Sequence, residues 1–114
     1  SEFVARFMGG HNILKSSQGL VAVRGDRIQV SLANASVSQP GMQATLTDIE
    51  YQGSFSLLTF RPLETSQEPM TVMLPEQSVD PTWQVGMDCH LHWAEADSHV
   101  LGPGLAPSRS PLAA

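Results

Sequence analysis

Gly9, Lys15 and Ser16 have the spacing of a phosphate-binding loop, in which a glycine-rich turn surrounds the phosphates and a lysine contacts them. Leu14, however, occupies the position of the second glycine, which such a loop needs for its backbone to curl. Residues 3–8 also lack the pattern of the buried strand that leads into these loops. The sequence therefore does not predict nucleotide binding by this segment.

A second candidate is the run Cys89-His90-Leu91-His92, with His99 nearby, because these side chains are of the types that bind transition metals. If the run is a strand, alternation puts His90 and His92 on one face and Cys89 on the other. The chain has no second cysteine to help complete a set of four ligands. The sequence predicts two exposed strand histidines beside a buried free cysteine, with only weak, adventitious metal binding.

Two further groups of polar residues lack the geometry that catalysis requires. Asp97, Ser98 and His99 have the residue types of a hydrolytic triad, but consecutive residues cannot converge as orienting acid, nucleophile and base. Asp48 and Glu50 have the spacing of many solvated strand faces, and no acid or base role follows from it. The sequence assigns no catalytic residue and no metal site, and predicts that this chain is not itself an enzyme.

The composition restricts the class of protein. The chain has 114 residues, of which 41% are hydrophobic and 15% charged, so it can bury one modest core as a single domain. Six basic against eleven acidic residues leave a net charge of −5, and Lys15 is the only lysine, which disfavours nucleic acid as a partner. No run of about 18 apolar residues is present to span a membrane. The single cysteine, Cys89, favours a reducing, cytoplasmic setting.

Short β-strands dominate the pattern. Apolar runs and period-two alternation predict strands at residues 20–24, 28–32, 44–51, 55–60, 70–74 and 89–93. In the strand that begins at Ala44, Ala44 and Leu46 share one parity, and Ile49 and Tyr51 share the other. The inward face must therefore change near Asp48, which predicts a β-bulge there.

Six or seven short strands separated by glycine and proline turns predict an all-β fold, a small OB-like β-barrel. Residues 1–19 are interpreted as a helical turn at residues 2–8, followed by a connector from an ATPase domain that lies outside this chain. Residues 20–101 are interpreted as the barrel, and residues 102–114 as a disordered tail. We expect the start at Ser1 to be a cut inside a longer protein.

The order of short motifs along the chain resembles a known family. In order, the motifs are Phe7-Met8-Gly9-Gly10-His11-Asn12, Val21-Ala22-Val23-Arg24, Asp48-Ile49-Glu50-Tyr51-Gln52-Gly53-Ser54, Val85-Gly86-Met87-Asp88 and Trp93. This series resembles the C-terminal TOBE (transport-associated OB) domain of ABC importer ATPase subunits, in the polyamine, ferric-iron and maltose-type group. One departure is Arg24-Gly25-Asp26, where the family has Arg-Pro-Glu, so a flexible residue replaces a rigid one.

The resemblance implies a regulatory and dimerisation domain of the ATP-binding subunit of an ABC-type importer, with polyamine transport preferred. The implied partners are a second ATPase subunit and the permease, at the cytoplasmic face of the membrane and without insertion into it. ATP and Mg²⁺ would belong to the missing ATPase domain, and no cofactor is expected in this chain. Related molybdate systems imply an alternative, a module that binds an oxyanion or the transported solute.

The residues expected to contact a ligand or a protein partner lie in two predicted turns. Arg24, Asp26 and Arg27 lie in or beside the turn between the first two predicted strands, and Tyr51 and Gly53 in or beside a turn near the middle of the chain. Arginines and free backbone amides bind anions, and exposed turns are where partner contacts concentrate. These five residues form the predicted site.

Overall fold

The computed structural model describes residues 10–17 and 19–102. Its strands are β1 (His11–Ser16), β2 (Gly19–Arg24), β3 (Gln29–Leu32), β4 (Gly41–Tyr51), β5 (Phe55–Pro62), β6 (Met70–Pro75), β7 (Asp88–His92) and β8 (Ser98–Gly102). Three 3-10 turns interrupt them, η2 (Gly25–Arg27), η3 (Glu76–Ser78) and η4 (Glu95–Asp97). The predicted all-β class is confirmed. The helical turn predicted at residues 2–8 and the tail after Gly102 lie outside the described residues.

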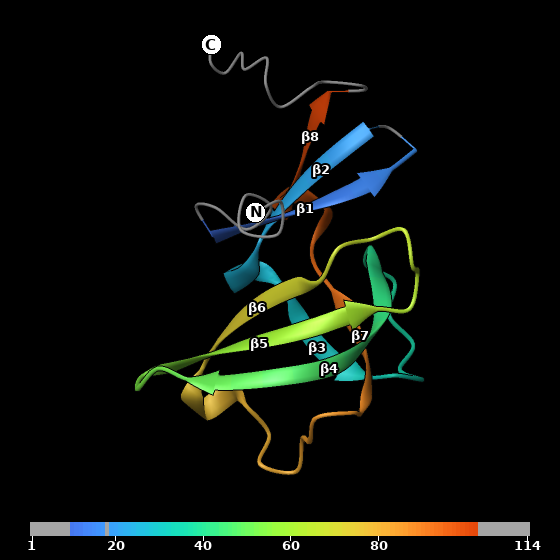
Figure 1. Cartoon of the computed structure of the whole chain (residues 1–114). Helices are drawn as coiled ribbons and strands as arrows, with labels where there is room; N and C mark the ends of the chain where they lie inside the picture. The colour runs from blue at the N-terminus through green and yellow to red at the C-terminus, as the bar shows by residue number, and fades with distance from the viewer. Residues whose placement is uncertain (1–9, 18, 103–114) are drawn as a thin grey trace.

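The strands form two antiparallel sheets (Figure 1). A three-stranded sheet has the order β1-β2-β8, and a five-stranded sheet has the order β3-β7-β4-β5-β6. Two continuous segments connect the sheets: β2 continues through η2 into β3, and β7 continues through η4 into β8. The five-stranded sheet curls, and the three-stranded sheet extends beyond it as in an OB-like barrel (Figure 1). Across the described residues, no helix is long and apolar enough to cross a membrane.

One hydrophobic core unites the two sheets. It is made of Leu14, Val23, Ile28, Ala44, Leu46, Leu58, Phe60, Met70, Val72, Cys89, Leu91 and Trp93. These side chains come from β1 and β2 of the smaller sheet as well as from β4 to β7 of the larger one. Each fully buried large apolar side chain contributes about 1.5–3 kcal/mol relative to exposure. The two sheets therefore form a single folding unit.

The predicted bulge in β4 is confirmed, since the β4–β5 register shifts between Leu46 and Asp48. Leu46 is fully buried before the shift, and Ile49 packs against the core after it. An extra residue in one strand exchanges the two faces beyond it, so both parities of β4 reach the same core. Tyr51, expected inward with Ile49, is instead 68% exposed, because β4 ends there beyond the edge of the core.

Two strands, β1 and β8, are missing from the sequence prediction. β1 lies within the residues assigned to a connector, yet it pairs along its whole length with β2. β8 covers the end of the predicted barrel and pairs with the other edge of β2. Neither segment alternates cleanly, because Ile13 and Leu14 are adjacent in β1, and Val100 and Leu101 are adjacent in β8. Tertiary pairing with β2, rather than local pattern, makes both segments strands.

Candidate functional site

Two side-chain amides join the sheets along the gap between β1 and β6. In Asn12, which is 2% exposed, Nδ2 donates to the carbonyl oxygen of Thr71 at 2.8 Å, and Oδ1 accepts from the Thr71 N–H at 2.8 Å. Gln67 does the same for Lys15, accepting from its N–H at 3.0 Å and donating to its carbonyl at 2.8 Å. Each amide takes the place of a peptide group on a neighbouring strand. Side-chain amides thus join the two sheets, from β1 to β6 at Asn12 and from β1 to the β5–β6 loop at Gln67, where no described ladder pairs the strands.

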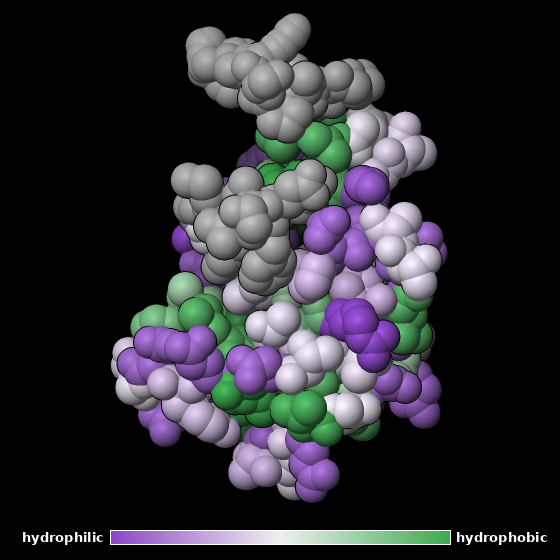
Figure 2. All heavy atoms as spheres, viewed as in Figure 1, coloured by the Kyte–Doolittle hydropathy of each residue, from purple (hydrophilic) through white to green (hydrophobic). Residues whose placement is uncertain are grey.

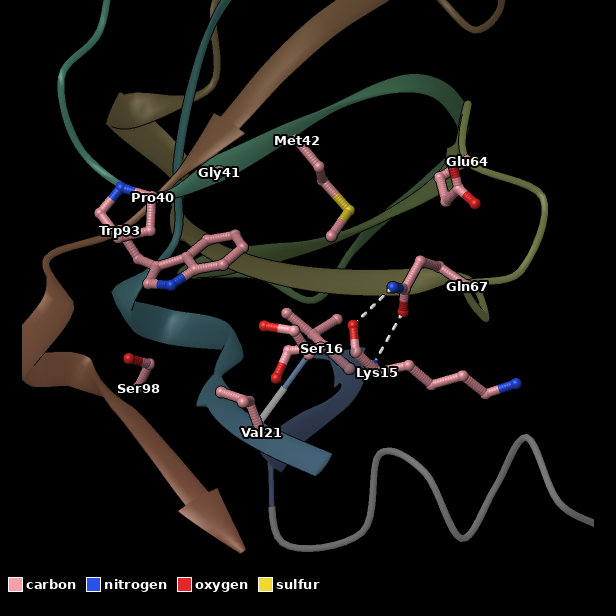
Figure 3. Close-up of a pocket in the computed structure, with 12 residues that line it drawn as sticks. Lys15, Ser16, Val21, Pro40, Gly41, Met42, Glu64, Gln67, Trp93 and Ser98 are labelled. Carbon is pink, nitrogen blue, oxygen red and sulfur yellow. Dashed lines mark hydrogen bonds between the residues drawn. The ribbon is translucent and has the colours of Figure 1, made fainter. Parts of the chain in front are cut away.

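A cleft of about 440 Å³ opens beside this seam (Figure 3). Its apolar lining comes from Leu14, Val21, Pro40, Met42 and Trp93. Its polar lining comes from Lys15, Ser16, Ser17, Glu64, Gln67 and Ser98, with the Gly41 backbone between the two groups. The volume lies within the range of small-molecule sites, and the lining is mixed rather than predominantly apolar.

The electrostatics of the cleft disfavour a multiply charged anion. Its lining holds one lysine and one carboxylate, Lys15 and Glu64. The Lys15 side chain extends away from the Trp93 indole, whereas Met42 lies on the same side of the cleft as that ring (Figure 3). Glu64 lies at the other end of the cleft from the Trp93 indole (Figure 3), and this ring is 5% exposed. The lining of the cleft is therefore charge-balanced, and it lacks the excess of positive charge that would select a multiply charged anion.

The structure brings three of the predicted site residues together at η2. Arg24 lies 2.6 Å from the Asp26 carboxylate, and Arg27 lies 4.0 Å from Asp97 of η4. The Arg24 and Asp26 side chains are 49% and 39% exposed, so their pair adds little to stability. Both arginines already have an acidic neighbour, and η2 lies against β6. This turn is a charge-balanced surface link between the two sheets.

The other two predicted site residues lie at the β4–β5 hairpin tip. Gly53 has φ 100°, a conformation that side chains disfavour, and the Gln52 N–H donates to the Phe55 carbonyl at 2.8 Å to close the turn. Tyr51 stands at the start of this tip, exposed. Within residues 10–17 and 19–102, no hydrogen bond or ion pair joins the tip to η2. The five predicted residues thus form two separate surface features.

The histidines and cysteine of β7 do not assemble a metal site. Among the described residues, no group of three or more His, Cys, Asp or Glu side chains is placed to hold a metal ion. Cys89 is buried as predicted, and burial, with a smaller effect of Asp88, raises the pKa of its thiol. His90 and His92 do share one face, with ring centroids 5.7 Å apart.

The prediction that His92 is exposed is wrong, because the chain between β3 and β4 returns to meet it. His92 is 7% exposed, its Nδ1 donates to Oε1 of Gln39 at 2.9 Å, and its Nε2 lies 2.7 Å from the Ser31 hydroxyl. These contacts use both ring nitrogens of a neutral imidazole, with the hydroxyl donating to Nε2. His92 therefore anchors the β3–β4 connection that leads to the cleft.

Stability should consequently fall as the pH drops below about 6.5. Burial, reinforced by the neighbouring His90, lowers the pKa of His92 from its ordinary value of 6.5. Between that lowered pKa and 6.5 the unfolded chain binds more protons than the folded chain. The contribution of neutral His92 to the free energy of unfolding is therefore complete above about pH 6.5 and is lost as the pH falls below it. Urea unfolding midpoints measured from about pH 8 to about pH 5 test this. His92→Gln should flatten the decline, whereas the exposed control His99→Gln should not; equal slopes in both variants would contradict it.

The remaining sequence candidates are occupied in structural contacts. Lys15 and Ser16 lie in the extended strand β1 rather than in a phosphate-binding turn. The Ser98 hydroxyl donates to the Glu95 carbonyl at 2.8 Å, and His99 points from β8 as an exposed residue. These arrangements contain no nucleophile held by a base.

Sequence reasoning missed the residues that build the cleft and its seam. Asn12 ends the first quoted motif, and its role required knowledge that β6 lies beside β1. Gln67 comes from a polar loop with no periodic signal. The only signal that the sequence offers is that Asn12, a polar residue, directly precedes the apolar residues Ile13 and Leu14, where a buried side chain is expected.

Comparisons with known proteins agree with this architecture. The family described as "TOBE domain" matches residues 21–101. Proteins named Spermidine/putrescine import ATP-binding protein PotA, from Bacillus thuringiensis (strain Al Hakam) and Bacillus anthracis, are each 28% identical over 99 residues. The match covers 87% of this chain but 30% of each relative, so the chain spans less than a third of the length of these relatives.

A solved structure shares the fold. The cytoplasmic molybdate-binding protein ModG, in its PEG-grown form with molybdate bound, superimposes with a TM-score of 0.60 at 12% sequence identity. The match covers 70% of this chain and 58% of ModG. The family match spans seven of the eight described strands wholly or in part, from within β2 to within β8. This chain belongs to the TOBE domain family.

Proposed function

We propose that this chain is the TOBE domain of the ATP-binding subunit of an ABC-type importer, where it serves as a regulatory and docking domain. The observation that carries this proposal is the match to import ATP-binding proteins over 87% of the chain. Because the match is only 30% of each relative, the rest of the subunit is the place for ATP binding and hydrolysis. The names of the relatives make polyamines the preferred transported solute.

The physical properties of the domain suit such a role. A β-domain whose two sheets share a single core is a rigid platform, and its exposed turns at η2 and at the β4–β5 tip are available to partner proteins. The partners in this proposal are a second ATP-binding subunit and the permease, at the cytoplasmic face of the membrane. A net charge of −5 favours protein partners over nucleic acid.

ATP and Mg²⁺ do not fit the described residues. Lys15 and Ser16 lie in a strand whose backbone is already paired with β2 and with Gln67, so their N–H groups cannot surround a phosphate. The carboxylates of the described region do not gather into a group that could hold a metal ion. No step of ATP hydrolysis is therefore assigned to this chain.

A second candidate function is the binding of a small solute in the cleft. The observation that favours it is the combination of Trp93, Met42 and Glu64 in one cavity of about 440 Å³. A carboxylate and an indole in one lining can contact a cationic solute, such as the polyamines named in the relatives, and the Lys15 side chain extends away from that indole. An oxyanion, as in ModG, would find one lysine there and arginines already beside carboxylates.

Calorimetry on the 114-residue chain separates these functions. We expect no ATP turnover and no heat with MgATP, molybdate, sulfate, putrescine or spermidine, because docking needs none of these ligands. In the complete subunit, deleting residues 20–101 should alter or abolish transport while the ATP-binding domain still binds ATP. Saturable heat with spermidine that Glu64→Gln weakens, while Glu76→Gln does not, would establish the second function instead. Turnover of ATP by the isolated chain would refute the first.

A further inference from the structure

Gly41 is the residue of β4 whose backbone faces the cleft. The Trp93 N–H donates to the Pro40 carbonyl at 3.1 Å, which places Pro40 in a hydrogen-bonded pair with the end of β7. Successive residues of an antiparallel strand point their backbone groups to opposite neighbours, so Gly41 directs its N–H and carbonyl away from β7. Gln43 has the same parity and shows the same direction, because its carbonyl accepts from the Leu63 N–H at 3.0 Å. The N–H and carbonyl of Gly41 therefore point to the side of β4 on which Leu63 lies.

These two backbone groups of Gly41 have no partner within the described part of the chain. The β4–β5 ladder begins only at the pair of Ala44 with Pro62, and its register does not reach Gly41. The β5–β6 loop that follows contributes Glu64 and Gln67 to the lining of the cleft, and no hydrogen bond joins this loop to Gly41. A free N–H and a free carbonyl on one strand residue are the groups by which a further strand joins a sheet.

The indole of Trp93 supplies a second unused donor in the same cleft. Trp93 is 5% exposed, and no acceptor among the residues that the structure describes receives a hydrogen bond from its Nε1–H. The nitrogen lies on the edge of the ring that faces Val21 and Ser98 across the cleft (Figure 3). A buried indole N–H usually has a hydrogen-bond partner. This nitrogen therefore marks a position where a bound molecule would place an acceptor.

We propose that the cleft binds an extended, uncharged peptide segment of a partner protein, which joins β4 at Gly41 as one further strand. One residue of the segment donates its N–H to the Gly41 carbonyl and accepts from the Gly41 N–H, and an oxygen of a neighbouring residue accepts from Nε1 of Trp93. A peptide residue carries one donor and one acceptor, as Gly41 does. A protonated polyamine offers only donors and an oxyanion such as molybdate only acceptors, so neither can satisfy both groups of Gly41.

The position of the segment determines which side chains it needs. Side chains on either side of the residue paired with Gly41 lie on the face of the sheet that carries Met42, where Leu14, Val21 and Trp93 line the cleft. This lining is mixed and holds one lysine and one carboxylate, which favours valine or threonine over charged residues in the segment. Figure 2 likewise shows hydrophobic and hydrophilic residues interspersed over the described surface on its side of the molecule.

This inference rests on the proposed docking function, because it assigns that function a contact surface separate from the turns at η2 and at the β4–β5 tip. Only one residue of β4 has both backbone groups free toward the cleft, so an isolated peptide should bind weakly. Binding should strengthen when the segment belongs to a partner that contacts the domain elsewhere, because the second contact raises its effective concentration.

Peptides selected on the 114-residue chain from a phage-displayed library of random heptapeptides are the probes. Titration of the isotope-labelled chain with these peptides, followed by NMR, should shift the Gly41 amide and the Trp93 indole N–H most. Replacing one peptide bond of the probe at a time by an ester removes a single N–H and leaves the protein unchanged. The ester at the residue that pairs with Gly41 should raise the dissociation constant about three- to tenfold. Esters at the two flanking residues, whose N–H groups point away from β4, should change it by less than about twofold.

Trp93→Phe tests the second donor. This variant keeps an aromatic ring but removes the N–H, so it should bind the same peptides about three- to tenfold more weakly. The matched control Trp83→Phe, outside the lining of the cleft, should bind them like wild type. Circular dichroism melts show whether the variants are folded. The ester series, which needs no protein variant, tests the proposal even if Trp93→Phe does not fold.

The outcomes separate the surface from the function. Failure to select any peptide, selected peptides that shift resonances away from Gly41 and Trp93, or an ester series without a sensitive position overturns the proposal. Shifts at Gly41 on concentrating the chain alone would assign the cleft to a second copy, and spermidine shifts there without peptide binding would assign it to a solute. Each of these also overturns it. None of these results affects the assignment to an importer subunit, which the ATP and transport measurements test.

Discussion

Replacing Asn12 by alanine should lower the free energy of unfolding by about 2–4 kcal/mol. The Asn12 amide is buried and satisfies both the N–H and the carbonyl of Thr71 in β6, while Nδ2 also lies 3.4 Å from the Val23 carbonyl. Alanine would leave the two Thr71 groups without these partners, and each buried unpaired polar group costs about 1–3 kcal/mol. Chemical denaturation followed by tryptophan fluorescence measures the loss, because Trp93 is in the core beside the seam.

Two variants isolate the cause of this loss. Asn12→Asp keeps the side-chain volume and the oxygen that accepts from the Thr71 N–H, but it places a second oxygen against the Thr71 carbonyl. This variant should therefore still be less stable than wild type, and its stability should fall further as the carboxyl ionises. Gln67→Ala removes the equivalent amide pair from Lys15 at a half-buried site, where water can replace it, and should cost only about 0.5–1 kcal/mol. If Gln67→Ala lowered the free energy of unfolding as much as Asn12→Ala, or if Asn12→Asp were as stable as wild type, the burial of the Asn12–Thr71 hydrogen bonds would not explain the effect.

Replacing Gly41 by alanine should be similarly damaging, by about 3 kcal/mol. An added Cβ would lie 2.2 Å from the Leu91 carbonyl oxygen and 3.1 Å from both Nε2 of His90 and Cα of His92. Two of these three atoms are backbone of β7, so relief requires β4 and β7 to separate where Gly41 pairs with His92. Overpacking that moves backbone costs about 1–3 kcal/mol or more. Thermal and urea unfolding measure the loss directly.

Gly53→Ala is the matched control for this prediction. Gly53 has φ 100° and open space around its Cα, so alanine there meets conformational strain without any clash. The expected cost is about 1–2 kcal/mol. Gly41→Ala should also change the contacts of His92 and hence the decline of stability below about pH 6.5, whereas Gly53→Ala should leave that slope unchanged. If Gly41→Ala lowered the free energy of unfolding less than Gly53→Ala, the close approach of β4 and β7 would not explain why Gly41 is needed.

The parts of the fold that the sequence predicted are those with local causes. The bulge near Asp48 follows from a change of parity between Leu46 and Ile49, which chain pattern alone reveals. The turn at Gly53 follows from a residue that tolerates positive φ. β1 and β8 were missed because their apolar residues are adjacent rather than alternate, and only pairing with β2 makes them strands.

The candidate site divides in the same way. Arg24, Asp26 and Arg27 lie together because they are neighbours in one short turn, whereas the Asp97 partner of Arg27 comes from a distant segment. The cleft could not be found from sequence, because its lining comes from β1, β2, β4, the β5–β6 loop and the ends of β7 and β8. His92 was predicted to be exposed because strand alternation shows only which face of a sheet a residue lies on. It does not show that another segment covers this face, and here the segment that carries Gln39 does so.

The sequence by itself determined the class of protein. Short alternating strands, few charges and a negative net charge predict a small all-β barrel without a nucleic-acid site, and the order of its motifs identified the TOBE family. These properties depend on residue type and spacing along the chain, which the sequence contains. Only the tertiary structure decided how the two sheets are joined, since the seam, the Gly41 approach and the cleft bring together residues that are distant in the sequence, such as Asn12 and Thr71 in the seam and Leu14 and Ser98 in the cleft lining.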